Sequence, residues 1–162
     1  MRVTLFIYLL IGAVVGIHAE IDSHCTKTES VIFSCQIKDS DKIFSLCASK
    51  DISDTSGYIQ YRFGRLNKVE LTFPNDRLHS QKRFLYRHYF RSQVDRVEIA
   101  FANHGEKYTI YSYYEGDGEG TPVEEKGVRV GNVDLQCKEP SKADFTLLEN
   151  SIPYDEESVL GR

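Results

Sequence analysis

Short apolar stretches, each bounded by polar or glycine-containing turns, recur along the chain from residue 31 to residue 137. In several of them apolar and polar residues alternate, which is typical of a β-strand with one buried face. Turn sequences such as Asn103-His104-Gly105 and Gly131-Asn132 separate consecutive stretches. The predicted strands are Val31–Ile37, Ile43–Ser49, Tyr58–Phe63, Lys68–Phe73, Arg83–Phe90, Val94–Ala102, Lys107–Tyr114, Gly127–Val130 and Val133–Cys137.

About eight or nine short strands at this spacing predict an all-β fold, a single antiparallel barrel or sandwich that is closed or nearly closed. One short C-terminal helix is expected over Ser141–Asn150, because Ser141 and Asp144 have capping-box spacing. The last residues are acidic and poor in core residues, which predicts a flexible tail over residues 151–162. The folded domain is therefore expected to span residues 20–150.

The first 19 residues have the pattern of a cleavable export signal. Arg2 precedes an apolar run over residues 5–15, and Ala19 supplies a small residue at the expected cleavage point. The run is too short to span a bilayer comfortably, so we expect no membrane insertion after cleavage. The mature chain is predicted to lie in an oxidising compartment.

All four cysteines, Cys25, Cys35, Cys47 and Cys137, lie in the predicted mature chain, and an even number in an exported protein predicts two disulfides. If Asp39–Asp41 forms a hairpin turn, Cys35 and Cys47 fall almost opposite each other on paired strands. This favours Cys35 with Cys47 and Cys25 with Cys137. The competing pairing is Cys25 with Cys35 and Cys47 with Cys137.

Charge is distributed unevenly along a chain whose formal net charge is -4. Residues 77–96 carry six arginines and lysines against one aspartate, and aromatic residues are interleaved with them. Arginine and tyrosine are enriched at the centres of protein interfaces, whereas a solvated strand paired with a nearby acidic loop is the alternative reading. Nucleic acid is a poor partner for an exported acidic chain. The candidate partner-binding residues are Arg83, Tyr86, Arg87, Tyr89 and Arg91.

The acidic loop after the seventh predicted strand resembles the start of a calcium-binding loop. Glu115, Asp117 and Glu119 occupy alternate positions and Gly120 follows, but Lys126 stands where a bidentate glutamate is required. A solvated hairpin loop is the alternative. No His-x-x-x-His, Cys-x-x-Cys or Gly-x-Ser-x-Gly pattern is present. We therefore expect no cofactor, no other metal site and no enzymatic activity.

Several segments resemble, in order, a family of small exported four-cysteine proteins of Gram-negative bacteria that are described only as hypothetical. These segments are Val31–Cys35, Ser45–Ser49, Gly57–Gly64, Glu70–Pro74 and Leu135–Cys137. In size, compartment and all-β character the chain is also similar, as a class, to periplasmic lysozyme inhibitors and to toxin-immunity proteins. These likenesses imply a periplasmic, non-enzymatic binding protein with a protein partner, a toxin or hydrolase directed at the cell wall or membrane. The alternative is an accessory envelope protein that binds peptidoglycan or an exported machine.

Overall fold

The structure is a computed structural model that describes residues 21–155. The predicted signal peptide over residues 1–19 and residues 156–162 of the predicted tail lie outside the described residues. The elements are β1 (Glu29–Ile37), β2 (Lys42–Ser49), β3 (Ile59–Arg65), β4 (Lys68–Phe73), the 3-10 helix η1 (Ser80–Arg83), β5 (Leu85–Arg91), β6 (Val94–Asn103), β7 (Glu106–Glu115), β8 (Val123–Val130) and β9 (Val133–Ala143).

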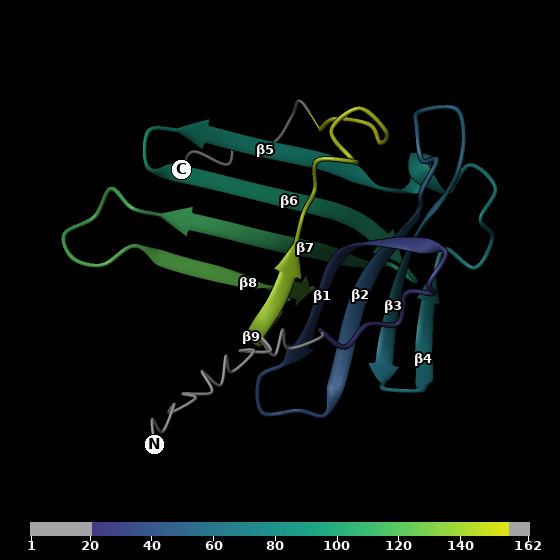
Figure 1. Cartoon of the computed structure of the whole chain (residues 1–162), viewed down its shortest axis with the longest axis horizontal. Coiled ribbons are helices and arrows are strands. Elements are labelled where there is room, and N and C mark those ends of the chain that lie inside the picture. The colour runs from purple at the N-terminus through teal and green to yellow at the C-terminus, as the bar shows by residue number, and fades with distance from the viewer. Residues whose placement is uncertain (1–20, 156–162) are drawn as a thin grey trace, which may run out of the picture.

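The all-β prediction is confirmed, and the nine strands form one antiparallel sheet in the order β4-β3-β2-β1-β9-β8-β7-β6-β5. The sheet curls into a half-barrel, with β5–β8 crossing behind β1–β4 and the long strand β9 joining the two halves (Figure 1). Strands β4 and β5 are the two edges. They converge at one end, where the ring of Phe73 stacks on Phe101 at 4.6 Å between centroids and lies 5.7 Å from Phe84.

The concave side of the half-barrel holds an aromatic core. Tyr61 on β3 lies 6.2 Å from Phe44 and 5.2 Å from Phe101, which stacks on Tyr108 at 4.7 Å. Aliphatic residues such as Ile99 and Ile110 fill the space beside these rings and are fully buried. Each fully buried aromatic or aliphatic side chain stabilises the fold by about 1.5–3 kcal/mol. Contacts across the core therefore hold the two halves of the sheet together where no strand pairing does.

The convex face of β1–β3 is covered by the N-terminal segment, residues 21–28. The backbone amide of His24 donates to Ser45 Oγ at 3.0 Å, and Ser34 Oγ donates to the carbonyl oxygen of Asp22 at 2.8 Å. Gln60 and Arg62, which alternate with core residues on β3, are consequently buried as well. Strand β3 is thus enclosed on both faces.

All four cysteines are disulfide-bonded as predicted, but both pairings considered from the sequence are wrong. The bonds join Cys25 to Cys47 and Cys35 to Cys137. In the β1–β2 register Cys35 lies opposite Phe44, so it shares the core-facing side of the sheet with that residue. Cys47 is three residues further along β2 and therefore points to the convex face, where the N-terminal segment carries Cys25.

The expected helix over Ser141–Asn150 is not formed. Strand β9 continues to Ala143 and pairs with β1 through Ser34–Lys142 and Phe33–Ala143, so this backbone belongs to the sheet. The side chain of Asp144 accepts hydrogen bonds from the amide and hydroxyl of Thr146 at 3.3 Å and 2.7 Å. A short polar side chain that bonds its own neighbouring backbone favours a turn over a helix. Successive turns follow to residue 151.

The chain stays attached to the sheet beyond the predicted domain end at residue 150. Ile152 is buried, and Tyr154 forms a parallel bridge with Tyr86 on the edge of β5. The backbone amide of Tyr86 donates to the carbonyl oxygen of Pro153 at 2.8 Å, and the amide of Asp155 donates to the carbonyl oxygen of Tyr86 at 2.9 Å. Residues 151–155 thus cover part of this edge. Within residues 21–155 no helix is long and apolar enough to cross a membrane.

Candidate functional site

Strand β5 distributes the predicted partner-binding residues over two faces of the sheet. Tyr86 points into the core and is 3% exposed, next to His88 on the same face. Arg87, Tyr89 and Arg91 lie on the convex face, because side chains alternate along a strand. Arg83 ends η1, just before β5. The structure therefore does not bring the five residues together into one surface.

Two arginines of the basic stretch form ion pairs with carboxylates at the point where β7 ends and the acidic loop begins. Arg91 forms an ion pair with Asp117, and Arg96 forms one with Glu115. Both ion pairs are those expected from the alternative interpretation of the basic stretch, a solvated strand that pairs with a nearby acidic loop. The hydrogen bond between Arg91 and Asp117 raises the pKa of Arg91 and lowers the pKa of Asp117. The hydrogen bond from Arg96 to Glu115 raises the pKa of Arg96.

The same ion pairs weaken the calcium hypothesis for Glu115, Asp117 and Glu119. Two of these three carboxylates are bound by arginine, and a calcium ion would have to displace it. Among the residues that the structure describes, no group of three or more His, Cys, Asp or Glu side chains is arranged to hold a metal ion.

Arg87 lies at the junction of two carboxylates. Its Nη1 is 3.1 Å from Glu98 Oε2, and its Nη2 is 2.5 Å from Asp155 Oδ2. Burial alone would lower the pKa of Arg87, but hydrogen bonds to Asp155 and Glu98 raise it above its usual value. Glu98 also binds Arg129 and the hydroxyl of Tyr113 on the neighbouring strands. Arg87 is thus a member of a convex-face network as well as part of the basic stretch.

A basic groove opens beside the converging edges β4 and β5, with a volume of about 540 Å³. Its floor is apolar and is formed by Phe73, Leu85, Ala100, Phe101 and Ala102, and its cations are Lys82, Arg83, Arg87 and Lys107. We call this set the basic groove. Lys107 reaches it because β7 pairs with β6 through Ala102–Lys107, next to β5.

Three of the four cations of the basic groove differ from Arg87 in their surroundings. No ion pair joins Lys82, Arg83 or Lys107 to a carboxylate among residues 21–155. All three side chains are exposed, whereas Arg87 is largely neutralised by Glu98 and Asp155. An apolar floor beneath exposed cations suits a ligand that offers a carboxylate next to apolar groups.

The wall of the groove that carries Lys82 and Arg83 is held rigidly by a hydrogen-bond network. The hydroxyl of Ser80 accepts a hydrogen bond from the Ile59 amide at 2.8 Å. Gln81 Nε2 donates to the carbonyl oxygens of Ser53, Ser56 and Gly57, at 3.2, 2.6 and 3.0 Å. Gln60 Nε2 donates to the carbonyl oxygen of Pro74 at 2.8 Å, at the start of the same connection. The groove is therefore preformed.

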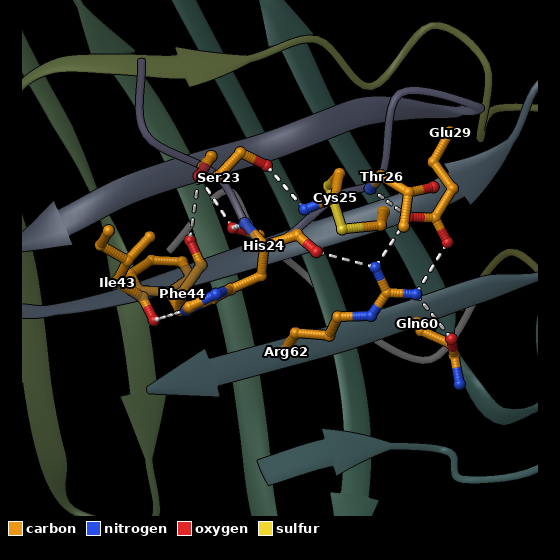
Figure 2. The surroundings of a disulfide bond; sticks show 12 residues. Ser23, His24, Cys25, Thr26, Glu29, Ile43, Phe44, Gln60 and Arg62 are labelled. Atoms are coloured by element: carbon orange, nitrogen blue, oxygen red, sulfur yellow. Dashed lines mark hydrogen bonds and ion pairs between the residues drawn. A yellow bond between two sulfur atoms is a disulfide. The ribbon is translucent and has the colours of Figure 1, made fainter. Parts of the chain in front are cut away.

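Gln60 belongs in turn to a buried charge cluster under the N-terminal segment (Figure 2). Arg62 donates two hydrogen bonds to the Glu29 carboxylate, each at 2.7 Å, and one to the carbonyl oxygen of His24 at 2.9 Å. Burial alone would raise the pKa of Glu29, but hydrogen bonds from Arg62, the Thr26 amide and the Tyr58 hydroxyl lower it to about 2. The cluster fixes the segment that carries Cys25.

A separate polar cavity of about 250 Å³ lies on the concave face between β5–β7 and residues 143–149. His88 Nε2 is 2.8 Å from Asp95 Oδ1 there, and Ser112 lines the same cavity. Within the described part of the chain no hydrogen bond joins Ser112 to His88. The contact is a histidine–carboxylate pair, without the nucleophile–base bond that marks an assembled triad.

Sequence reasoning missed Lys82 and Lys107 as members of the candidate site. Lys82 was counted only as part of the basic stretch, and Lys107 lies 20 residues beyond Arg87 on a different strand. The β6–β7 hairpin turn at Asn103–Gly105 was the available signal, because a two-strand register through it places Lys107 beside Ala102. Comparisons of the chain with models of protein families, with curated proteins and with solved structures find no match.

Proposed function

We propose that this protein is a non-enzymatic, exported binding protein that docks an acidic segment of a protein partner in the basic groove. The observation that carries the proposal is the combination of an apolar floor with three cations that lack a carboxylate partner among residues 21–155. Charge complementarity of this kind mainly raises the rate of encounter, whereas an apolar anchor seated in the groove slows dissociation.

The partner class we favour is a hydrolase or toxin directed at the cell wall or membrane, which the protein would inhibit or neutralise by steric occlusion. Clefts of glycoside hydrolases contain paired carboxylates, and arginine binds a carboxylate bidentately. Two disulfides on a small sheet suit the oxidising periplasm. The rigid attachment of η1 supports the same proposal, because a preformed site loses little entropy on binding.

The test is affinity capture from an envelope extract with residues 20–162 as bait, at low and at moderate salt. We expect capture of a hydrolase or toxin whose activity falls on titration with the bait. The variant Lys82→Glu/Arg83→Glu/Lys107→Glu should lose it. A matched control with the same change in charge is Lys27→Glu/Lys38→Glu/Lys50→Glu, at exposed positions outside the groove.

Equal capture by the groove variant and the control variant contradicts docking in the basic groove. Sedimentation of the protein with purified cell wall, without capture of a protein partner, supports instead the accessory envelope role in which the ligand is peptidoglycan. Both outcomes require that each variant retains the thermal midpoint of the wild type, which circular dichroism measures.

A further inference from the structure

A third, chemically different cavity lies inside the half-barrel, where β3 and β4 face β7, β8 and β9. Its volume is about 310 Å³. The lining residues share an apolar or aromatic character, and they are Tyr61, Phe63, Leu71, Tyr108, Val130, Val133 and Leu135. We call it the apolar cavity. It shares no lining residue with the basic groove.

Tyr61 is the feature of this cavity that points to a ligand. The residue is 1% exposed, and its hydroxyl has no hydrogen-bond partner among residues 21–155. Among residues 21–155 the buried side-chain atom without a partner is Gln81 Oε1 and not the Tyr61 hydroxyl, so this hydroxyl keeps some accessible surface although its ring is buried. Tyrosine hydroxyls in such places usually find a hydrogen-bond partner, and a ligand in the cavity would supply one. Burial and the nearby Tyr108 raise the pKa of Tyr61, so its hydroxyl stays protonated and can donate.

The charges near the cavity are kept outside it. Lys42 lies over the ring of Phe63, 5.0 Å from its centroid, and is held by Glu70 at 2.7 Å. No charged side chain lines the cavity itself. An ionised ligand would therefore lose its hydration without gaining a counter-charge, which is strongly unfavourable.

We propose that the apolar cavity binds a small, uncharged hydrophobic molecule that carries one hydrogen-bond acceptor, such as a carbonyl oxygen, which receives the hydroxyl proton of Tyr61. Mouths of curled sheets and barrels are common sites for small apolar ligands, and volumes upward of about 300 Å³ accommodate them. A cavity of about 150 Å³ is already enough for benzene, so a substituted ring or a short acyl chain fits here. This site is independent of partner docking in the basic groove.

The probe for this site is N-phenyl-1-naphthylamine, whose fluorescence rises in apolar surroundings. The full mature chain should enhance it, and two competitors of similar shape should displace it with different potency. Acetophenone carries a carbonyl oxygen, whereas cumene has a methyl group in its place. Cumene is the more hydrophobic of the two, so the informative quantity is the potency of acetophenone relative to cumene. We expect this ratio to be about fivefold higher for the wild type than for Tyr61→Phe, the effect of one net hydrogen bond.

Two variants separate the hydroxyl from the cavity. Tyr61→Phe should still bind the probe and cumene as the wild type does, but acetophenone should become a weaker competitor. Val133→Trp should fill the mouth and weaken probe binding by about tenfold or more. Val133 is 58% exposed, so the larger ring is tolerated by the fold. The matched control is Val123→Trp, because Val123 is 50% exposed on β8 and does not line the cavity.

Absence of probe enhancement by the wild type overturns the proposal, as does equal enhancement by Val133→Trp and Val123→Trp. A ratio of acetophenone to cumene potency that is the same for the wild type and Tyr61→Phe overturns the role of the Tyr61 hydroxyl. Sedimentation velocity tests the alternative that a second copy of the chain covers the cavity. A wild-type dimer that Val133→Trp dissociates means that a second copy of the chain covers the cavity, which also contradicts the proposed ligand.

Discussion

At the scale of single residues, the outer face of β1–β3 depends on Glu29. Its side chain is fully buried and accepts hydrogen bonds from Arg62, Tyr58 and the Thr26 amide. A buried ion pair need not stabilise a fold more than apolar residues of the same shape, but removal of one partner leaves an uncompensated charge. Glu29 therefore controls whether the N-terminal segment stays on the sheet.

We predict that Glu29→Gln lowers the free energy of unfolding at pH 7 by about 3 kcal/mol. The folded pKa of Glu29, about 2, lies below its ordinary value of 4.5, so the stabilisation is present above pH 4.5 and is lost as pH falls toward 2. Urea unfolding between pH 7 and pH 2 should thus show the wild type approaching the variant. A gap that stays constant over this range contradicts the assignment.

A second residue-scale prediction distinguishes two arginines of β5. Arg87→Glu places a third carboxylate beside Glu98 and Asp155 and should destabilise the protein by about 3 kcal/mol. Arg91→Glu at the exposed end of the strand should leave the thermal midpoint nearly unchanged, since exposed ion pairs contribute little. Thermal unfolding of the two single variants checks this, and equal midpoints would refute the network role of Arg87.

At the scale of elements, the two disulfides secure different parts of the sheet. Cys35–Cys137 joins β1 to β9 across 102 residues of sequence, whereas Cys25–Cys47 joins the N-terminal segment to β2 across 22 residues. In the chain-entropy account a longer closed loop gives more stabilisation. The first bond therefore stabilises the junction between β1 and β9, where the two halves of the half-barrel meet.

We predict that Cys35→Ala/Cys137→Ala costs about 4.7 kcal/mol of unfolding free energy and Cys25→Ala/Cys47→Ala about 3.4 kcal/mol. Denaturant unfolding of both double variants measures the difference. Capture of a partner by the basic groove should survive loss of Cys25–Cys47, provided that the protein stays folded. A larger loss of stability on removal of Cys25–Cys47 than on removal of Cys35–Cys137 would contradict the view that Cys35–Cys137 stabilises the junction between β1 and β9.

The strands were predictable because their signals are local. In β5, for example, the two-residue period of a strand by itself places Tyr86 and His88 on one face and Arg87 and Tyr89 on the other. The disulfide pairing was not predictable, because it depends on which face Cys47 occupies and on a segment that crosses the convex side. Likewise, the turn at Asp144 replaced a helix because strand pairing with β1 outweighed a weak capping signal.

At the scale of the whole molecule, the half-barrel separates three kinds of chemistry. The convex face carries neutralised charge networks, the concave face holds the apolar cavity and the His88–Asp95 pair, and the basic groove lies at the converging edges. Sequence reasoning found Arg83 and Arg87 but missed Lys107, because joining it to them requires the registers of two successive hairpins, β5–β6 and β6–β7. The groove is a property of the topology.

Site-specific photo-crosslinking tests the central claim, docking in the basic groove, most directly. p-Benzoylphenylalanine replaces Leu85, which is 39% exposed in the groove, or Val123, which is 50% exposed elsewhere. Irradiation in envelope extract should give a partner adduct from position 85 and none from position 123, and Lys82→Glu/Arg83→Glu/Lys107→Glu should abolish the adduct. Equal adducts from both positions, or an adduct that persists in the triple variant, would contradict the account.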